Sequence, residues 1–233
     1  MKLSNIFERK EVKYRLTHKQ YQDIQELLKD KMQEDKYGEH SILSLYYDTD
    51  DYQMIRKSIE KPDYKEKFRI RSYGCAEKNK EIFLEIKKKI NGIVYKRREK
   101  FILNELNFKS FLKLENQTQR EINYLFSKYP LKAKVLIAYE RVAMYDKETK
   151  EFRITFDKNI RYRKENLSIK DSSGEAIDPE LEVLMEVKAL GAYPIWFVSI
   201  LNQFKLQKSS FSKFATSYKN HLQFEKENDQ LSA

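Results

Sequence analysis

Hydrophobic and polar positions alternate with a period of two along much of the chain, which is the pattern of half-buried β-strands. Residues 65–73, KEKFRIRSY, place Phe68 and Ile70 on one face and Arg69 and Arg71 on the other. The same alternation predicts seven further strands, at 8–16, 41–49, 81–89, 93–103, 134–146, 151–163 and 181–190. Asn91-Gly92 separates two of these segments and predicts a tight hairpin, so the strands are expected to pair antiparallel.

A second pattern, with a period near 3.6 residues, predicts helices between the strands. Thr17 and Gln20 have the spacing of a capping box, and Pro194 suits the first position of a helix. Helices are expected at 17–32, 52–59, 104–129, 195–206 and 209–222. The chain is therefore predicted to have an α+β fold, as one domain over residues 1–222 followed by a polar tail at 223–233.

The charge balance changes this picture, because the chain has 46 basic against 36 acidic residues and a net charge of +10. Such an excess favours an anionic partner, whether nucleic acid, a phosphorylated metabolite or an acidic membrane surface. One cysteine and three separated histidines exclude an internal disulfide and argue against a Cys or His metal site. No window approaches eighteen apolar residues, so we expect a cytoplasmic protein without a membrane segment of its own.

The charged strand faces have two interpretations. An antiparallel sheet with one face in water gives the same alternation, and most single charged strands are of this kind. Arginine and lysine dominate at 65–71 and 95–98, however, which favours a closed sheet with a cationic interior and a polyanionic ligand. Interior carboxylates, Glu85, Glu186 and Glu11 among them, would then hold a divalent metal that bridges phosphates.

Eight segments, in this order, resemble a known family. They are ERKEVKYRL at 8–16, YYDTDDYQMIRK at 46–57, KFRIRSYG at 67–74, EIFLEIKKK at 81–89, YERVAMYD at 139–146, FRITFDKNIRYR at 152–163, LMEVKALGAYPIW at 184–196 and SFSKFATSY at 210–218. The family is the CYTH and triphosphate tunnel metalloenzyme superfamily, and the closer match within it is the polyphosphate polymerase domain of the vacuolar transporter chaperone (VTC) group.

The resemblance implies an eight-stranded antiparallel β-barrel that forms a triphosphate tunnel, with helices packed outside and a C-terminal helix at the tunnel. It implies transfer of the γ-phosphoryl group of ATP to a growing inorganic polyphosphate chain, assisted by Mn²⁺ or Mg²⁺. ATP and polyphosphate are thus the expected partners. A membrane-protein partner that exports the product is left open, as are chain length and oligomeric state.

The resemblance also implies the roles of individual residues. The expected catalytic residues are Arg69, Arg71, Lys87, Lys96, Arg141 and Arg153. The expected substrate-binding residues are Lys13, Tyr139, Ser212, Lys213 and Arg9, and the expected metal ligands are Glu186 and Glu85. Glu85 has a second interpretation, as a carboxylate that orients the neighbouring cations. Tyr46, Tyr47 and Trp196 are expected in the core.

The first strand departs from the superfamily pattern of Glu-x-Glu-x-Lys, because Arg9, Glu11 and Lys13 occupy these spacings. Arginine in the first slot suits the polymerase group better than the hydrolases and cyclases. Two alternatives are kept: a triphosphatase or cyclase on the same scaffold, and a non-catalytic module that binds polyphosphate or RNA. Cations that alternate with core residues favour an enclosed site, so no nucleic acid is expected.

Overall fold

The computed structural model describes residues 9–77, 79–103 and 116–223, without the side chain of Arg9. Contacts divide the chain into two compact units, each made of segments that are distant in the sequence. The first unit comprises Met1–His40, Glu140–Asn159 and Asp178–Phe211. The second comprises Ser41–Tyr139, Ile160–Ile177 and Ser212–Ala233.

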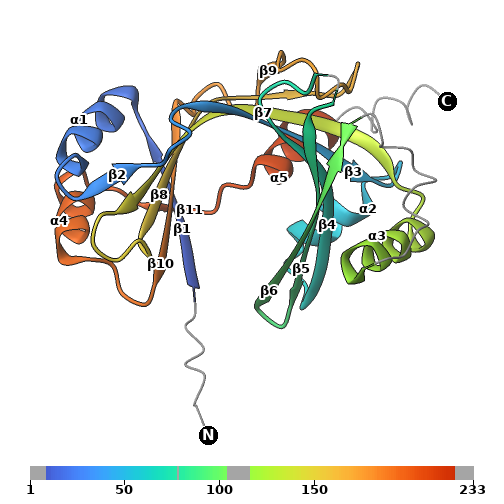
Figure 1. The fold of residues 1–233 in the computed structure, drawn as a ribbon, viewed down its shortest axis with the longest axis horizontal. Coiled ribbons are helices and arrows are strands. Elements are labelled where there is room, and N and C mark those ends of the chain that lie inside the picture. The colour runs from blue at the N-terminus through green and yellow to red at the C-terminus, as the bar shows by residue number, and fades with distance from the viewer. Residues whose placement is uncertain (1–8, 78, 104–115, 224–233) are drawn as a thin grey trace, which may run out of the picture. The chain divides into compact units, whose positions relative to one another are not determined.

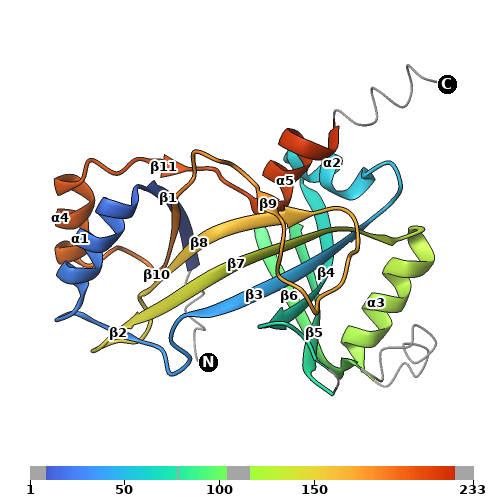
Figure 2. The same ribbon diagram turned by 90° about the horizontal axis from the view of Figure 1, so that it is seen from above.

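The first unit is a sheet covered by two helices. Its strand order is β11-β1-β10-β8-β7, with β2 paired to β7. The strands are β1 (Arg9–Leu16), β2 (Met32–Glu34), β7 (Lys132–Asp146), β8 (Arg153–Arg163), β10 (Val183–Leu190) and β11 (Lys208–Ser209). The strands β7 and β8 continue into the second unit. Helices α1 (His18–Leu28) and α4 (Ile195–Gln203) lie side by side next to these strands (Figures 1 and 2).

The alternation along β1 decides which face of this sheet is buried. Tyr14 pairs with Met185 and Val12 with Val187, so these side chains lie on the same face. Tyr14 and Met185 belong to the core that α1 and α4 cover. The opposite face carries the charged residues of the same strands, because successive side chains point to opposite sides.

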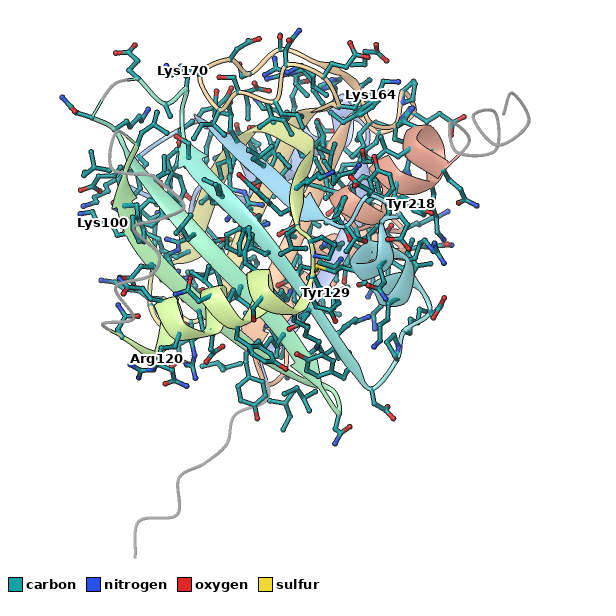
Figure 3. The ribbon with its side chains drawn as sticks, turned by 90° about the vertical axis from the view of Figure 1, so that its right-hand side faces the viewer. Lys100, Arg120, Tyr129, Lys164, Lys170 and Tyr218 are labelled. Carbon is teal, nitrogen blue, oxygen red and sulfur yellow. The ribbon has the colours of Figure 1, made fainter. Side chains whose placement is uncertain are left out.

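The second unit has the strand order β7-β3-β4-β5-β6, with β9 paired to β8. Its further strands are β3 (His40–Asp48), β4 (Tyr64–Tyr73), β5 (Glu81–Ile90), β6 (Ile93–Ile102) and β9 (Glu175–Ala176). Its helices are α2 (Gln53–Ile59), α3 (Gln117–Lys128) and α5 (Lys213–Ser217), which continues as a π-helical turn, η3 (Tyr218–Leu222). Figure 3 shows α3, marked by Arg120 and Tyr129 at its two ends, lying across the strands.

The core of the second unit lies between α3 and one face of β3, β4 and β5. Ile122 and Leu125 of α3 pack there with strand residues that alternate along the chain. These are Leu43, Leu45 and Tyr47 of β3, Phe68 and Ile70 of β4, and Ile82, Leu84 and Ile86 of β5. Because this face is apolar, the intervening residues of the same strands, including Arg69, Arg71 and Glu85, lie on the other face.

Several predictions about local structure are confirmed. The side chain and backbone of Thr17 and Gln20 form both hydrogen bonds of the capping box. Asn91 and Gly92 have φ of 46° and 85° and join β5 to β6, with Ile90 paired to Ile93. A two-residue turn of this kind needs positive φ at both positions, which asparagine and glycine tolerate.

Other boundaries differ from the prediction. Pro194 is the residue before helix α4 and not its first residue. The predicted helix over 104–129 is present as α3 from Gln117, and residues 104–115 lie outside the described residues. The short strands β2, β9 and β11 have two or three residues, too few to show a period of two in the sequence.

The predicted α+β class with antiparallel strands is confirmed, while the barrel itself stays a prediction. Eight of the eleven strands in the described residues have eight or more residues, and β1 with β10, β10 with β8, β3 with β4, β4 with β5, and β5 with β6 pair antiparallel. Their hydrogen-bonding order ends at β11 and at β6. The single domain over residues 1–222 likewise stays a prediction.

The described helices contain none that is both long and apolar enough to cross a bilayer.

The core position of Phe68 generates a stability prediction. Its ring is fully buried and makes edge contacts with Tyr47 and Phe126 at centroid distances of 5.4 and 5.2 Å. We expect Phe68→Ala to lower the free energy of unfolding by about 3–5 kcal/mol, because it opens a large cavity. Leu27→Ala, at a residue of α1 that is 44% exposed, is the control and should change it by about 0.5 kcal/mol or less. Equal effects in urea unfolding would contradict the assigned core.

Candidate functional site

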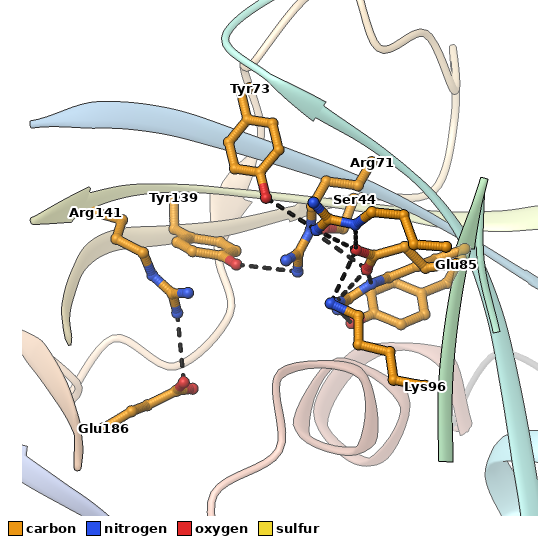
Figure 4. A network of polar contacts seen from close by, with 11 residues as sticks. Ser44, Arg71, Tyr73, Glu85, Lys96, Tyr139, Arg141 and Glu186 are labelled. Atoms are coloured by element: carbon orange, nitrogen blue, oxygen red, sulfur yellow. Dashed lines mark hydrogen bonds and ion pairs between the residues drawn. The ribbon is translucent and has the colours of Figure 1, made fainter. Parts of the chain in front are cut away.

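A single buried carboxylate lies at the centre of the charged face of the second unit. Glu85 of β5 is 2% exposed and pairs across the sheet with Arg69 of β4 and Arg98 of β6. Nε and Nη2 of Arg69 each lie 2.7 Å from Oε2 of Glu85. On the other oxygen, Lys96 Nζ lies at 3.0 Å and Arg98 Nε at 2.8 Å. Arg71 approaches Oε2 to 3.8 Å, so one carboxylate holds four cations (Figure 4).

These five residues, which we name the Glu85 cluster, set the protonation state of the carboxyl group. Burial by itself raises the pKa of Glu85, but Arg69, Arg71, Lys96 and Arg98 lower it further than burial raises it. The pKa of Glu85 therefore lies well below its ordinary value. Glu85 is ionised at neutral pH and is a poor proton acceptor, so it acts as a counter-ion.

The three arginines of the Glu85 cluster each have a second partner that holds the guanidinium in place. These partners are side-chain hydroxyl groups: Tyr46 at 2.8 Å from Arg69 Nη1, Ser44 at 3.3 Å from Arg71 Nε, Tyr139 at 3.4 Å from Arg71 Nη2, and Tyr73 at 2.9 Å from Arg98 Nη2. Figure 4 shows Ser44, Tyr73 and Tyr139 grouped around Arg71 and Glu85. Because each guanidinium group contacts both Glu85 and a hydroxyl group, its orientation is fixed before any ligand binds.

Tyr46 is buried, as expected of a core residue, and its hydroxyl also takes part in the Glu85 cluster's contacts. Its ring is buried and stacks on Phe214 of α5 at a centroid distance of 4.6 Å, while its hydroxyl accepts from Arg69. Burial raises the pKa of Tyr46, but Arg69, Arg71 and Lys67 lower it to about 8. Tyr47 points to the opposite face, lies in the core as predicted, and has its pKa raised by burial to about 12.

Lysines extend the positive charge along the three strands from the Glu85 cluster. Lys67, Lys87 and Lys96 are paired neighbours on β4, β5 and β6, and Lys65 pairs with Lys89 in the next row of the same face. Burial lowers the pKa of Lys65, and Lys89, Lys61 and Lys87 lower it further by repulsion. The lysine row is thus strongly positive, as the alternation predicts.

Of the two residues predicted near the C-terminal helix, Lys213 of α5 lies next to the Glu85 cluster and Ser212 does not. Nζ of Lys213 lies 4.5 Å from the centroid of the Tyr139 ring, next to the hydroxyl that accepts from Arg71. Ser212 is the N-cap residue of α5, and its carbonyl oxygen accepts from the backbone N–H of Thr216 at 2.8 Å. The structure thus brings Lys213 to the Glu85 cluster, whereas Ser212 begins the helix that carries it.

The charged face of the first unit has its own cluster, which we name the Arg141 cluster: Arg141, Asp157, Glu186 and Lys13. Arg141 of β7 donates to both oxygens of the fully buried Asp157, at 2.5 and 2.7 Å. Its Nη2 also lies 3.4 Å from Oε2 of Glu186, as Figure 4 shows. Lys13 Nζ lies 3.5 Å from Oε1 of Glu186 and donates to the carbonyl oxygen of Phe211 at 2.9 Å.

Two further predicted residues lie on strands of the first unit but outside this cluster. Arg153 is exposed on β8 and pairs with Lys188 of β10. Arg9 begins β1 opposite Leu190, and its side chain lies outside the described residues. Glu11 of the same strand lies 3.8 Å from Lys188 Nζ, so it is not brought to Glu186.

The two predicted metal ligands differ in how well they fit a divalent metal. Within the described residues, no three His, Cys, Asp or Glu side chains gather in a way that could hold a metal. Glu85 does not fit, because cations occupy both of its oxygens. Glu186 fits a metal that takes its other ligands from bound phosphates, as Mg²⁺ commonly does. Thr155 pairs with Glu186, and its buried Oγ1 has no hydrogen-bond partner among the described residues.

The sequence of this chain matches a known protein family. The model of the VTC domain matches residues 8–221, and the chain therefore belongs to this family. The predicted resemblance to the VTC group is thereby confirmed. No curated protein sequence matches the chain.

Two solved structures align with this chain at low sequence identity. A protein from Hippeastrum, proposed to be an adenylyl cyclase and described as having a dominant triphosphatase activity, aligns with a TM-score of 0.50 and 15% identity over 90% of this chain and 94% of its own. A protein from Vibrio parahaemolyticus, proposed to be an adenylate cyclase, aligns with a TM-score of 0.47 and 11% identity over 89% and 96%. The Hippeastrum protein thus shares the antiparallel α+β fold of this chain.

Sequence reasoning missed several residues of the two clusters. Arg98 shares the strand face of Lys96, and Ser44 and Tyr46 share a face of β3, so the period of two could have indicated all three. The sequence placed Tyr73 and Asp157 on strands with charged faces but did not indicate their roles in the clusters. Their partners are distant in the sequence, and only the strand register brings them together.

The contrast between Tyr46 and Tyr47 generates a pH prediction. Because the folded state holds the pKa of Tyr46 near 8, we expect tyrosinate absorbance at 295 nm to rise with a midpoint of about pH 8. This step should be absent in Tyr46→Phe and retained in Tyr47→Phe, since the pKa of Tyr47 is raised to about 12. Loss of a proton from Tyr46 adds a negative charge beside Arg69, so a bound polyanion should move the midpoint upwards. A titration unchanged in Tyr46→Phe would contradict the assignment.

The counter-ion role of Glu85 generates a stability prediction. Glu85→Gln leaves four mutually repelling cations without a carboxylate, and we expect it to lower the free energy of unfolding by about 3–5 kcal/mol. Glu121→Gln is the matched control, because Glu121 also binds two cations, Lys88 and Arg97, but is only partly buried. Its effect should be about 1 kcal/mol or less. Tripolyphosphate should raise the melting temperature of Glu85→Gln more than that of the parent; equal increments would argue against the counter-ion role.

Proposed function

We propose that the chain is an ATP-dependent polyphosphate polymerase, which transfers the γ-phosphoryl group of ATP to the end of an inorganic polyphosphate chain. The observation that carries the proposal is the Glu85 cluster, four cations around one buried carboxylate, in a chain whose VTC family match covers residues 8–221. As the superfamily implies, the substrate would lie in a tunnel enclosed by the eight long strands. The reaction would take place in the cytoplasm, where ATP is available.

The charge of the site supports a substrate with many phosphate oxygens. The Glu85 cluster carries four positive charges against one negative, and Lys67 and Lys87 lie in the adjoining row. Arginine forks and lysine ammonium groups both match phosphate oxygens. Because hydroxyl groups and Glu85 already hold the guanidinium groups, little reorganisation is needed when charge develops on the transferred group.

The arrangement supports phosphoryl transfer without a protein nucleophile. A terminal oxygen of the acceptor polyphosphate attacks the γ-phosphorus, the bond to the β–γ bridging oxygen breaks, and ADP leaves with that electron pair. The acceptor oxygen is already ionised at neutral pH, so no general base is required. Arg69, Arg71 and Lys96 would stabilise the charge on the equatorial oxygens. A divalent metal bound with Glu186 would supply further neutralisation of the phosphate oxygens.

The same residues fit water activation less well, which is why we place hydrolysis second. A triphosphatase must remove a proton from water, and a carboxylate is the usual group for this. Glu85 is paired with four cations, and both oxygens of Asp157 accept hydrogen bonds, from Nε and Nη2 of Arg141. The triphosphatase activity described for the Hippeastrum protein makes this alternative worth testing, together with cyclisation of a nucleotide and binding without turnover.

Incubation with ATP and Mn²⁺ tests the proposal. We expect ADP to accumulate together with long-chain polyphosphate, and we expect Arg69→Ala and Glu186→Ala each to lower the rate by about 100-fold or more. Arg97→Ala is the matched control. Arg97 is also a β6 arginine, but it lies on the face opposite Arg98 and binds Glu121. This variant should keep near-parental activity and a folded far-UV spectrum.

Each of the other outcomes of this assay would identify a different function. Orthophosphate without polymer would identify a triphosphatase, and release of a cyclic nucleotide with pyrophosphate would identify a cyclase. Tight polyphosphate binding without turnover would identify a binding module. Full activity in Arg69→Ala or Glu186→Ala would refute the role given to that residue.

A further inference from the structure

The end of the β5–β6 hairpin exposes an apolar surface that neither the core nor the Glu85 cluster uses. In the described part of the chain, ten large hydrophobic side chains are exposed, and four of them lie within six residues of one another here. Ile90 is 38% exposed, Ile93 60%, Val94 51% and Tyr95 45%. Contiguous exposed apolar side chains on a folded protein mark interaction sites.

The apolar side chains lie on both faces of the hairpin. Ile90 pairs with Ile93, and Tyr95 shares that face because it is two residues further along β6. Val94 points to the other face, where it pairs with Lys89. A docked protein surface would cover one face of a hairpin. A medium that surrounds the end of the hairpin would cover both.

Lysines follow directly behind the apolar residues. Lys87, Lys88, Lys89 and Lys96 precede and follow the turn, and Lys65 of β4 pairs with Lys89. Lys61 belongs to the loop that adjoins the turn, since the Asn91 backbone N–H donates to the Asp63 carbonyl oxygen at 2.9 Å. Acidic groups nearby are Glu60, Asp63, Glu66 and Glu121, of which Glu66 pairs with Lys88 across the sheet and Glu121 binds Lys88 and Arg97. The lysines outnumber these carboxylates.

We propose that the end of this hairpin, Ile90 to Tyr95, inserts shallowly into the surface of an anionic lipid bilayer, with the flanking lysines on the lipid phosphates. Isoleucine and valine would enter the boundary between headgroups and acyl chains, and tyrosine suits the same depth because its ring is apolar and its hydroxyl polar. Lysine stems can lie along apolar surface while their ammonium groups stay among the headgroups.

Charge and topology favour a bilayer over the other occupants. A second copy of this chain would bring two lysine-rich hairpins together, and like charges would oppose the contact. Free polyphosphate would satisfy the lysines but leave the isoleucines and valine in water. Strand β6 is at the end of the hydrogen-bonding order, so the hairpin can enter a lipid surface without breaking strand pairs.

Flotation of the full chain with lipid vesicles tests the proposal. We expect binding to phosphatidylcholine vesicles that contain 30% phosphatidylserine, at least tenfold weaker binding to pure phosphatidylcholine, and loss of binding in 0.5 M NaCl. The double variant Ile93→Ser/Val94→Ser should bind the anionic vesicles at least tenfold more weakly. Lys89→Glu should weaken binding in the same direction. Ile93 and Val94 lie outside the Glu85 cluster and its lysine rows, so phosphate chemistry should be unchanged in the double variant.

A matched apolar control distinguishes binding through this hairpin from non-specific hydrophobic adsorption to the vesicles. Ile195 and Val198 of helix α4 are 85% and 40% exposed, and neither end of this helix has a charged residue in its terminal turn. Ile195→Ser/Val198→Ser removes a similar exposed surface and should leave vesicle binding at the parental level.

Three results would overturn the proposal. The first is equal binding of the parent to neutral and anionic vesicles. The second is unchanged vesicle binding by the folded Ile93→Ser/Val94→Ser variant. The third is a dimer in sedimentation velocity that this variant loses, without vesicle binding by the parent, because the hairpin would then contact a second copy.

Discussion

The ion pairing of Glu85 is the interaction on which the candidate site depends. A carboxylate that is 2% exposed is stable only when cations replace the water that it loses. Conversely, Arg69, Arg71, Lys96 and Arg98 would repel one another if this carboxylate did not lie between them. The requirement links three adjacent strands, since the cations come from β4 and β6 and the carboxylate from β5.

The cluster leaves a net positive charge, which is the property that a phosphate ligand would use. One carboxylate is enough to hold four cations in place but not to neutralise them. Hydroxyl groups from β3, β4 and β7 then direct the guanidinium groups: Tyr46 towards Arg69, Tyr73 towards Arg98 and Tyr139 towards Arg71. Charged groups on rigid strands, with their partners already in position, are what electrostatic catalysis of phosphoryl transfer requires.

The carboxylates of the two units also limit the chemistry. Glu85 and Asp157 are held by cations on both oxygens, while Glu186 makes longer contacts of 3.4 and 3.5 Å with Arg141 and Lys13. Of these three, Glu186 is therefore the one whose oxygens can turn to a metal or a ligand at least cost. Glu85 and Asp157 are therefore poorly placed to act as general bases.

By itself, the sequence determined the alternating strand faces, the hairpin at Asn91-Gly92, the cap of α1 and the family, because these depend on neighbours close in the chain or on motif order. Only the tertiary structure decided that Glu85 is a counter-ion, that Tyr46 belongs to the site although Tyr47 is core, and that Arg98 belongs to the cluster. Arg69 is 16 residues from Glu85 and 23 from Tyr46, and Arg71 is 68 from Tyr139. Contacts over such separations depend on strand register, and a shift by one residue would turn each of these side chains to the opposite face.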